Sequence, residues 1–428
     1  MKLKKTTVLL KVLACILSIL LLCCSCNKDN KNSLSSNNQT SSNGEKLGED
    51  NMSILNNVDI KDTTLTPFER SVITYGDPGR VAGVLKKAER GEDITICVLG
   101  GSITQGAGSS NADELSWAAL VRDWFKAAYQ NINVTLVNAG IGATDSVYGV
   151  FRLEDDVIKY NPDLVVVEFC VNDRGVSAAK EAFEGIIRRL LSSSDQLAVI
   201  SLATSSNQGE STQDIHTDTC RNYHVPFLSY WNAYSMMFSN GDIDIKECYS
   251  DALHPTDKGH AMLAQLLKDY LDYVKNKIDD IDTTPKSGLN PPITADRYEN
   301  TIRYDNTTLV TTDKDGNDSN NKSGSGGWTL STKNPTIKFS VENAYIIHIG
   351  YTKTPAESAG KIRVLLNGIE ASDPIDSYFK DGWGSYYCIG TILDIETSNS
   401  FEVEITLDTN DKENARFWIS NILVASKK

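Results

Sequence analysis

Short apolar runs alternate with amphipathic stretches between residues 58 and 281. The runs are rich in β-branched residues, and they predict strands at 94–99, 134–137, 164–169, 197–202 and 225–228. Apolar residues at helical spacing predict helices over 81–89, 117–129, 149–159, 178–191 and 256–277. Strands and helices that alternate in this way indicate βαβ units, so the sequence predicts a three-layer α/β domain around a parallel five-stranded sheet.

The pattern changes beyond residue 281. Residues 282–296 are rich in proline and glycine, which predicts a linker. From residue 297 to 428 no helical period occurs, and short alternating runs stand at 336–341, 344–349, 362–366, 401–407 and 417–424. Turn signals such as Asn367-Gly368 separate these runs. The carboxyl-terminal region is therefore predicted to be an antiparallel β-sandwich of jelly-roll type.

The amino terminus has the pattern of a secretory signal. Lysines precede an apolar run from residue 8 to 24, and small residues follow. The end of this run resembles a bacterial lipoprotein processing site, with Cys26 as the preferred lipidated residue and Cys24 as the alternative. An uncleaved membrane anchor is also compatible with the run.

Residues 27–57 follow the predicted signal peptide, residues 1–26, and are largely polar. A segment of this composition cannot bury a core, so it is expected to be a flexible tether. Lipidation would hold the protein at the extracellular face of a bacterial cell membrane, with the lipid as its only membrane contact.

Composition and charge exclude some classes of partner. The formal net charge is −14 and the sequence contains no basic cluster, which argues against binding to nucleic acid. The cysteines after Cys26 are odd in number and irregular in spacing, so neither a disulfide framework nor a zinc site is predicted.

Two segments carry residue types that suit nucleophilic catalysis. Ser102 follows two glycines at the end of strand 94–99, where open α/β sheets bind their ligands. Asp251 precedes His254 by three residues, so its carboxylate can accept the imidazole Nδ1–H. Each segment alone also fits an ordinary structural role.

Two further segments offer hydrogen-bond donors. Asn172 follows strand 164–169, and its amide could donate to an oxyanion. Gly142 follows strand 134–137, and its backbone N–H could do the same. A turn-capping asparagine and a turn glycine are the alternative interpretations.

Taken together and in order, the four segments resemble the SGNH branch of the GDSL hydrolase family. The matching blocks are Gly100–Thr104, 138–144, 171–173 and 251–254. The resemblance implies a flavodoxin-like fold, no metal or cofactor, Ser102 as nucleophile, and an oxyanion hole made of Ser102, Gly142 and Asn172. Two positions depart from the family pattern. Gly101 stands where aspartate is usual, and Cys170 stands where glycine is usual.

The resulting hypothesis is a secreted serine esterase that hydrolyses O-acyl esters, above all O-acetyl esters, of a carbohydrate through Ser102, His254 and Asp251. The carboxyl-terminal sandwich is expected to contribute carbohydrate binding, and an acylated polysaccharide is the expected partner. Two alternatives stay open: a lysophospholipase or thioesterase that acts on lipids, and a non-catalytic glycan-binding surface lipoprotein. Acyl transfer to another acceptor would use the same residues.

Other conspicuous residues have structural interpretations. His260 is expected to be packed or exposed rather than catalytic, and His216 to lie in a polar loop without an identifiable partner. Glu168, inside an apolar strand, is expected to be a paired buried carboxylate. Aromatic residues of the sandwich, such as Trp328 and Tyr387, could either stack on sugar rings or pack in the core.

Overall fold

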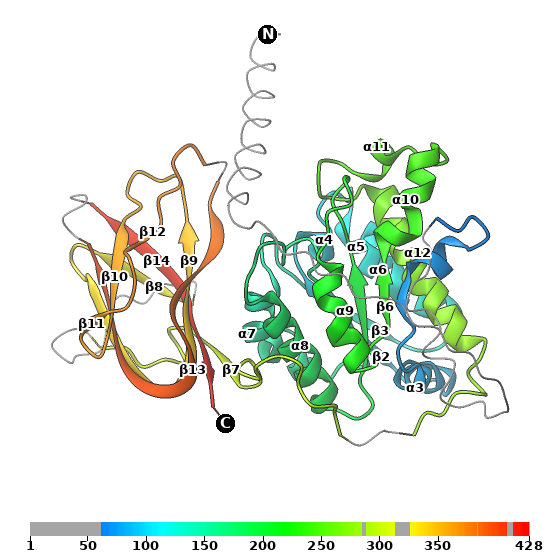
Figure 1. Ribbon diagram of the computed structural model, residues 1–428, viewed down its shortest axis with the longest axis horizontal. Coiled ribbons are helices and arrows are strands. Elements are labelled where there is room, and N and C mark those ends of the chain that lie inside the picture. The colour runs from blue at the N-terminus through cyan, green and yellow to red at the C-terminus, as the bar shows by residue number, and fades with distance from the viewer. Residues whose placement is uncertain (1–60, 285–287, 313–325, 383, 409–413, 428) are drawn as a thin grey trace, which may run out of the picture. The chain divides into compact units, whose positions relative to one another are not determined.

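A six-stranded sheet forms the middle of the amino-terminal domain in the computed structural model, with the order β1-β6-β5-β4-β2-β3 (Figure 1). The structure describes residues 61–284, 288–312, 326–382, 384–408 and 414–427. The strands are β1 (Val72–Thr74), β2 (Ile94–Gly100), β3 (Val134–Gly140), β4 (Leu164–Glu168), β5 (Ala198–Ala203) and β6 (Phe227–Ser229). The strands β2 to β6 are parallel, as predicted. The sixth strand, β1, was not predicted; it pairs antiparallel with β6 and is too short to show a period.

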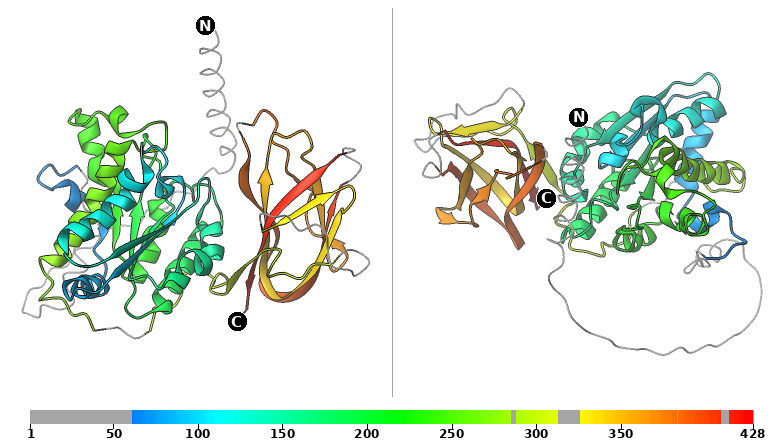
Figure 2. Two further views of the ribbon diagram at one scale, coloured as in Figure 1. Left: turned by 180° about the vertical axis from the view of Figure 1, so that it is seen from behind. Right: turned by 90° about the horizontal axis from the view of Figure 1, so that it is seen from above.

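Helices lie on both sides of this sheet (Figures 1 and 2). The five predicted helices correspond to α3 (Gly79–Glu89), α6 (Trp117–Ala128), α7 (Ser146–Asp156), α8 (Ala179–Ser193) and α12 (Asp257–Lys275). The sequence pattern did not predict α9 (Gln213–Asn222), α10 (Tyr230–Asn240) or the short helices α2 (Pro67–Ser71), α4 (Ser102–Gln105), α5 (Ala112–Leu115), η1 (Ile158–Tyr160) and α11 (Ile245–Cys248).

The sheet separates two apolar cores. Along β2, Ile96 and Val98 face the core that contains α3, α6 and α12, whereas Cys97 and Leu99 face the core that contains α7 and α8. Both faces of the sheet are thus covered, which explains why its strands are apolar without alternation. The predicted three-layer α/β fold is confirmed.

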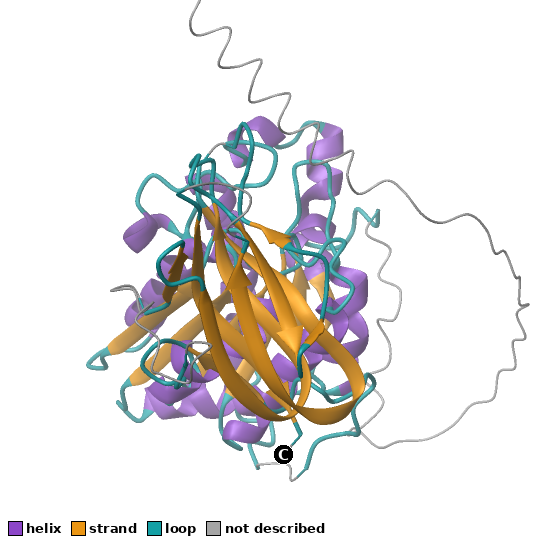
Figure 3. Ribbon diagram, turned by 90° about the vertical axis from the view of Figure 1, so that its left-hand side faces the viewer, coloured by secondary structure: helices purple, strands orange, loops and turns teal. Residues whose placement is uncertain are grey.

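The carboxyl-terminal domain, called the β domain here, consists of antiparallel strands (Figure 3). They are β7 (Thr301–Tyr304), β8 (Trp328–Ser331), β9 (Thr336–Lys353), β10 (Lys361–Leu366), β11 (Ile369–Glu370), β12 (Ile375–Asp376), β13 (Tyr386–Leu407) and β14 (Arg416–Ser426). The predicted runs 336–341 and 344–349 are two parts of the single strand β9. This strand and β13 pair with register shifts between Thr391 and Phe401, and both strands curve there (Figure 1).

The strand β14 has both faces buried. Leu423 and Ala425 belong to the apolar core around α7 and α8, whereas Ile422 and Val424 belong to the core of the β domain. The β domain therefore completes the core of the α/β domain. All described residues lie in one compact unit.

The segment before the β domain packs along α8. The carboxylate of Glu184 is buried, and it accepts hydrogen bonds from the backbone N–H groups of Ile293 and Thr294, both at 2.8 Å. Arg297 forms an ion pair of 2.7 Å with Glu181. These contacts fix the described part of the proline-rich segment against the α/β domain.

The predicted signal peptide, with Cys26 and Cys24, and the predicted tether up to residue 57 lie outside the described residues. Among the residues that are described, no helix is long and apolar enough to cross a membrane.

The environment of His348 on β9 lets us predict how the stability of the folded chain depends on pH. Its ring packs edge-on against Phe151 of α7, and neither ring nitrogen has a hydrogen-bond partner among the described residues. Burial lowers the pKa of His348 from 6.5 to about 4, although the charge of Asp394 acts in the opposite direction. The unfolded chain therefore binds a proton on His348 at a higher pH than the folded chain does, so stability falls as the pH drops from about 6.5 toward 4.

We expect His348→Leu to remove this dependence. Between pH 7.5 and 4.5 the variant should lose about 2–3 kcal/mol less free energy of unfolding than the wild type. Urea unfolding of both proteins at each pH measures the difference, and other titrating groups cancel because both proteins contain them. Equal losses would show that His348 does not titrate between these pH values.

Candidate active site

Ser102 lies at the carboxyl end of β2, where it begins α4. The helices that follow β2 and β4, α6 and α8, cover opposite faces of the sheet. The ends of these two strands therefore form the switch point at which open α/β sheets bind their ligands. Ser102 follows β2 at this point, and Asn172 lies in the segment after β4. The topology thus explains why two residues 70 positions apart in the sequence meet.

The two glycines before Ser102 are required by close packing. A Cβ atom at Gly100 would lie 2.1 Å from the Thr104 hydroxyl, and one at Gly101 would lie 2.2 Å from Asn172 Oδ1. Any side chain at position 101 would therefore require the side chain of Asn172 to shift.

Ser102, His254 and Asp251 form a continuous hydrogen-bonded line. The Ser102 hydroxyl lies 2.9 Å from His254 Nε2, and His254 Nδ1 lies 2.7 Å from Asp251 Oδ2. The serine and the aspartate thus contact different nitrogens of one imidazole. This is the geometry of a nucleophile, a general base and an orienting carboxylate.

The loop before α12 holds Asp251 in this position. Its second oxygen, Oδ1, accepts the backbone N–H groups of Leu253 at 2.7 Å and His254 at 2.8 Å. Partial burial by itself would raise the pKa of Asp251, but the hydrogen bonds from His254 and Leu253 outweigh it and lower the pKa. The carboxylate is therefore ionised at neutral pH and can support an imidazolium.

The two proposed oxyanion donors both lie near Ser102. The side chain of Asn172 contacts Gly101, and in the described part of the chain no protein group accepts a hydrogen bond from its amide. A Cβ atom at Gly142 would lie 3.8 Å from the Cβ of Ser102. The N–H of Gly142 donates to Gln105 Oε1 at 3.0 Å, so this side chain must move before Gly142 can bind an oxyanion.

A buried histidine fixes the segment that contains Asn172. His216 Nε2 lies 2.7 Å from Asp173 Oδ2, its Nδ1 lies 3.1 Å from Cys170 Sγ, and its ring stacks on Phe183 at 3.8 Å. The expectation of a partnerless loop histidine is wrong, because His216 lies on α9 and is fully buried. The spacing of His216 and Cys220 by one helical turn was the available signal.

Glu168 ends β4 below the candidate site. Its carboxylate accepts hydrogen bonds from the hydroxyls of Thr104 at 2.8 Å and Thr204 at 2.5 Å. Burial raises the pKa of Glu168. Its partners are thus two hydroxyl groups, and these contacts hold α4 against the sheet. Glu168 therefore has a structural role.

His260 is a packing residue, one of the two predicted alternatives. Its Nδ1 accepts the backbone N–H of Trp117 at 3.3 Å, and its Nε2–H donates to the carbonyl of Ala107 at 3.1 Å. In the β domain, Trp328 is fully buried in the core, and Tyr387 stacks on Tyr148. Trp328 is therefore closed to solvent, and one face of the Tyr387 ring is covered by Tyr148.

No group of three or more His, Cys, Asp or Glu side chains within the described ranges could hold a metal ion.

A parallel-sheet domain with this serine, histidine and aspartate at its carboxyl edge belongs to the class of serine hydrolases. Residues 98–262 match the model of the GDSL-like lipase/acylhydrolase family. The crystal structure of a two-domain esterase, CEX, active on acetylated mannans, is similar over both domains. It has 30% sequence identity and a TM-score of 0.74, and the match covers 84% of this chain and 99% of that chain.

A second crystal structure of CEX, co-crystallised with mannopentaose, has 29% identity and a TM-score of 0.74 over 84% of this chain and 98% of that chain. No curated protein matches the sequence significantly. The chain belongs to the GDSL-like lipase/acylhydrolase family and is a carboxylic ester hydrolase. The resemblance drawn from the four sequence segments is confirmed.

Proposed function

We propose that the protein is a serine esterase that removes O-acetyl groups from a mannan-type polysaccharide. The observation that carries the substrate class is the similarity to CEX, which extends over both domains at 30% identity. A match to the catalytic domain alone would not distinguish a carbohydrate esterase from other members of the family.

The geometry supports a two-step acyl transfer. Ser102 Oγ attacks the ester carbonyl while His254 Nε2 accepts the hydroxyl proton, and Asp251 stabilises the imidazolium that forms. The bond between the carbonyl carbon and the sugar oxygen breaks, and His254 gives its proton to that oxygen. Water then attacks the acyl-serine ester with His254 again as the base. The bond between the carbonyl carbon and Ser102 Oγ breaks, His254 returns the proton to Ser102 Oγ, and acetate is released.

The negative charge on the carbonyl oxygen requires donors opposite Ser102. The Asn172 amide, the Ser102 N–H and the Gly142 N–H are the groups proposed for this role. A substrate oxygen would replace Gln105 Oε1 as the acceptor of the Gly142 N–H. Each donor contributes about 100-fold or more to the rate, because it stabilises charge that exists only in the transition state.

The amino-terminal sequence supports a proposal for location. We infer that Cys26, or Cys24 as the alternative, is lipidated and holds the esterase at the extracellular face of a bacterial membrane. Metabolic labelling with a palmitate analogue tests this point, and labelling that survives replacement of both cysteines would contradict it.

Acetate release from acetylated polymers tests the substrate class. We expect residues 58–428 to release acetate fastest from acetylated mannan, and more slowly from acetylated xylan and acetylated peptidoglycan. The Ser102→Ala variant is the blank, and long-chain 4-nitrophenyl esters are the comparison. Faster release from xylan or peptidoglycan would overturn the mannan assignment, and turnover of long-chain esters alone would indicate a lipid hydrolase.

A further inference from the structure

A fully buried arginine on α7 forms hydrogen bonds with the ends of β2 and β3, the strands that precede Ser102 and Gly142. Arg152 Nη1 donates to the carbonyl of Ala139 on β3 at 2.6 Å, and Nη2 donates to the carbonyl of Gly100 on β2 at 3.0 Å. Ser102 follows Gly100 by two residues, and Gly142 follows Ala139 by three. One guanidinium therefore fixes the spacing of the strand ends from which the proposed nucleophile and one oxyanion donor extend.

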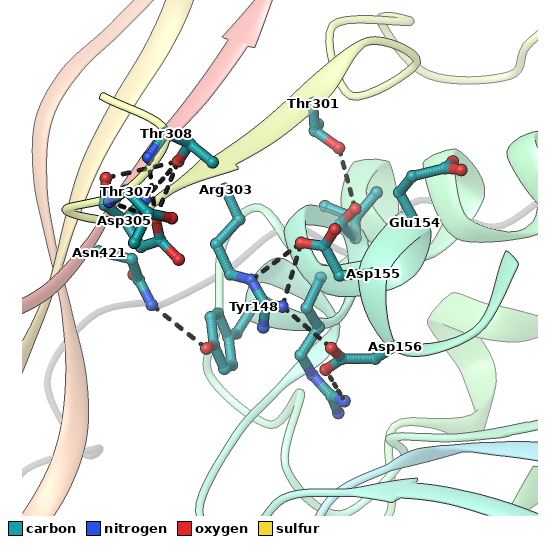
Figure 4. A network of polar contacts seen from close by, with 12 residues as sticks. Tyr148, Glu154, Asp155, Asp156, Thr301, Arg303, Asp305, Thr307, Thr308 and Asn421 are labelled. Atoms are coloured by element: carbon teal, nitrogen blue, oxygen red, sulfur yellow. Dashed lines mark hydrogen bonds and ion pairs between the residues drawn. The ribbon is translucent and has the colours of Figure 1, made fainter. Parts of the chain in front are cut away.

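The charge of Arg152 is balanced by a carboxylate that the β domain shares. A guanidinium out of contact with water needs a counter-charge, and Asp156 Oδ2 lies 3.2 Å from Arg152 Nη1. The other oxygen, Asp156 Oδ1, lies 3.0 Å from Nη2 of Arg303 on β7 (Figure 4). The same Nη2 also lies 3.0 Å from Asp155 Oδ2. An arginine of the β domain thus orients the partner of Arg152.

A second set of contacts reaches Arg152 through Tyr148. The Arg152 guanidinium carbon lies 5.6 Å from the centre of the Tyr148 ring. Tyr387 of β13 stacks on the same tyrosine, with the ring centres 4.3 Å apart. Asn421 of β14 donates to the Tyr148 hydroxyl at 3.3 Å (Figure 4). Two further residues of the β domain therefore hold the ring beside which Arg152 lies.

We propose that the β domain is part of the catalytic apparatus, because its contacts with Asp156 and Tyr148 hold Arg152 where it sets the spacing between Ser102 and Gly142. Arg152 and Arg303 are positioning residues in this proposal. The inference rests on the proposed function of Ser102. It concerns the rate of the chemical step and is independent of any glycan that the β domain binds.

The proposal predicts a loss of rate on a substrate without sugar. A displacement of about 1 Å between reacting groups can cost on the order of 100-fold in rate. Since Arg303→Gln removes one of the two sets of contacts, we expect kcat for 4-nitrophenyl acetate to fall about tenfold. KM should stay within about twofold, and the pH profile should not move, because Ser102, His254 and Asp251 are unchanged.

Arg363→Gln is the matched control. Arg363 also belongs to the β domain and also pairs with a carboxylate, Glu370, at 2.7 Å, but this pair is exposed at β10 and β11. Its replacement should leave kcat unchanged. Arg303→Lys keeps the positive charge near Asp156 and should restore part of the lost rate. All assays are made well below the melting temperature of each variant, measured by circular dichroism.

The outcomes separate positioning from simple stabilisation. If Arg303→Gln lowers only the melting temperature and the folded enzyme keeps the wild-type kcat, the inference is wrong. It is also wrong if Arg363→Gln loses as much rate. If Arg303→Gln does not fold, Arg303→Lys decides: an unchanged kcat overturns the inference and a reduced kcat supports it. A wild-type rate for Ser102→Ala in the same assay would instead overturn the proposed function.

Discussion

Replacement of Ser102 with alanine is expected to reduce kcat for ester hydrolysis on the order of 10⁵-fold. The alanine has no atom that can form the acyl-enzyme, so only the oxyanion donors and substrate binding remain. The fold should be unaffected, because within the described residues the Ser102 hydroxyl makes one hydrogen bond, to His254, and its loss costs about 1 kcal/mol. Initial rates with 4-nitrophenyl acetate and circular dichroism measure the two effects.

Two variants make this experiment specific. Ser192→Ala is the matched control, because Ser192 is an exposed serine at the end of α8, on the opposite edge of the sheet. It should keep the wild-type rate. Asp251→Asn should lose less than Ser102→Ala, roughly 10⁴-fold, because the imidazole then loses its orienting carboxylate while the nucleophile remains. A Ser102→Ala enzyme with substantial residual activity would show that another residue is the nucleophile.

Removal of the β domain is expected to destabilise the α/β domain severely. A chain that ends at residue 296 lacks Tyr298, Ile346, Leu423 and Ala425, all of which are buried in the core around α7 and α8. The apolar surface that they leave on the α/β domain becomes exposed to water, which favours unfolding and aggregation. We expect residues 58–296 to be insoluble or to unfold well below the melting temperature of residues 58–428.

A point substitution tests the same contact in the complete chain. Leu423→Ala is expected to lower the free energy of unfolding by about 2–5 kcal/mol, because it opens a cavity between the two domains. Ile369→Ala is the control, since Ile369 is 74% exposed on β11, and its effect should stay within about 0.5 kcal/mol. Urea unfolding followed by tryptophan fluorescence measures both. A 58–296 fragment as stable as the complete chain would show that the β domain is an independent attachment.

These predictions rest on features that the sequence reveals to different degrees. The parallel sheet is readable because β2 and β4 are continuous apolar runs, and the strands around them alternate with helices. The candidate triad is also readable. Asp251 and His254 lie within one turn of chain, and Ser102 stands where a buried strand meets a glycine turn. Local composition is enough for such features, because the residues concerned interact with their neighbours in the sequence or end a recognisable element.

The contacts that support the candidate active site cannot be predicted from local composition. His216 contacts Asp173 and Cys170, which lie more than 40 residues earlier in the sequence. Gln105 accepts the hydrogen bond of the Gly142 N–H, 37 residues away. In the sequence, Arg152 looks like an ordinary charged residue of a helix. Its two carbonyl partners at the strand ends become apparent only in the folded structure. Such contacts depend on which elements pack together, and the period of a single helix or strand does not contain that information.

The sequence by itself therefore determined the class of each domain, the order of the family's four segments and the residues at the edge of the sheet. Only the tertiary structure decided that the β domain completes the core of the α/β domain. On β14, the unbroken apolar run from Ile422 to Ala425 is consistent with two buried faces, but it does not say which element covers each face. The side of the strand that a second domain covers is fixed by packing between residues far apart in the chain.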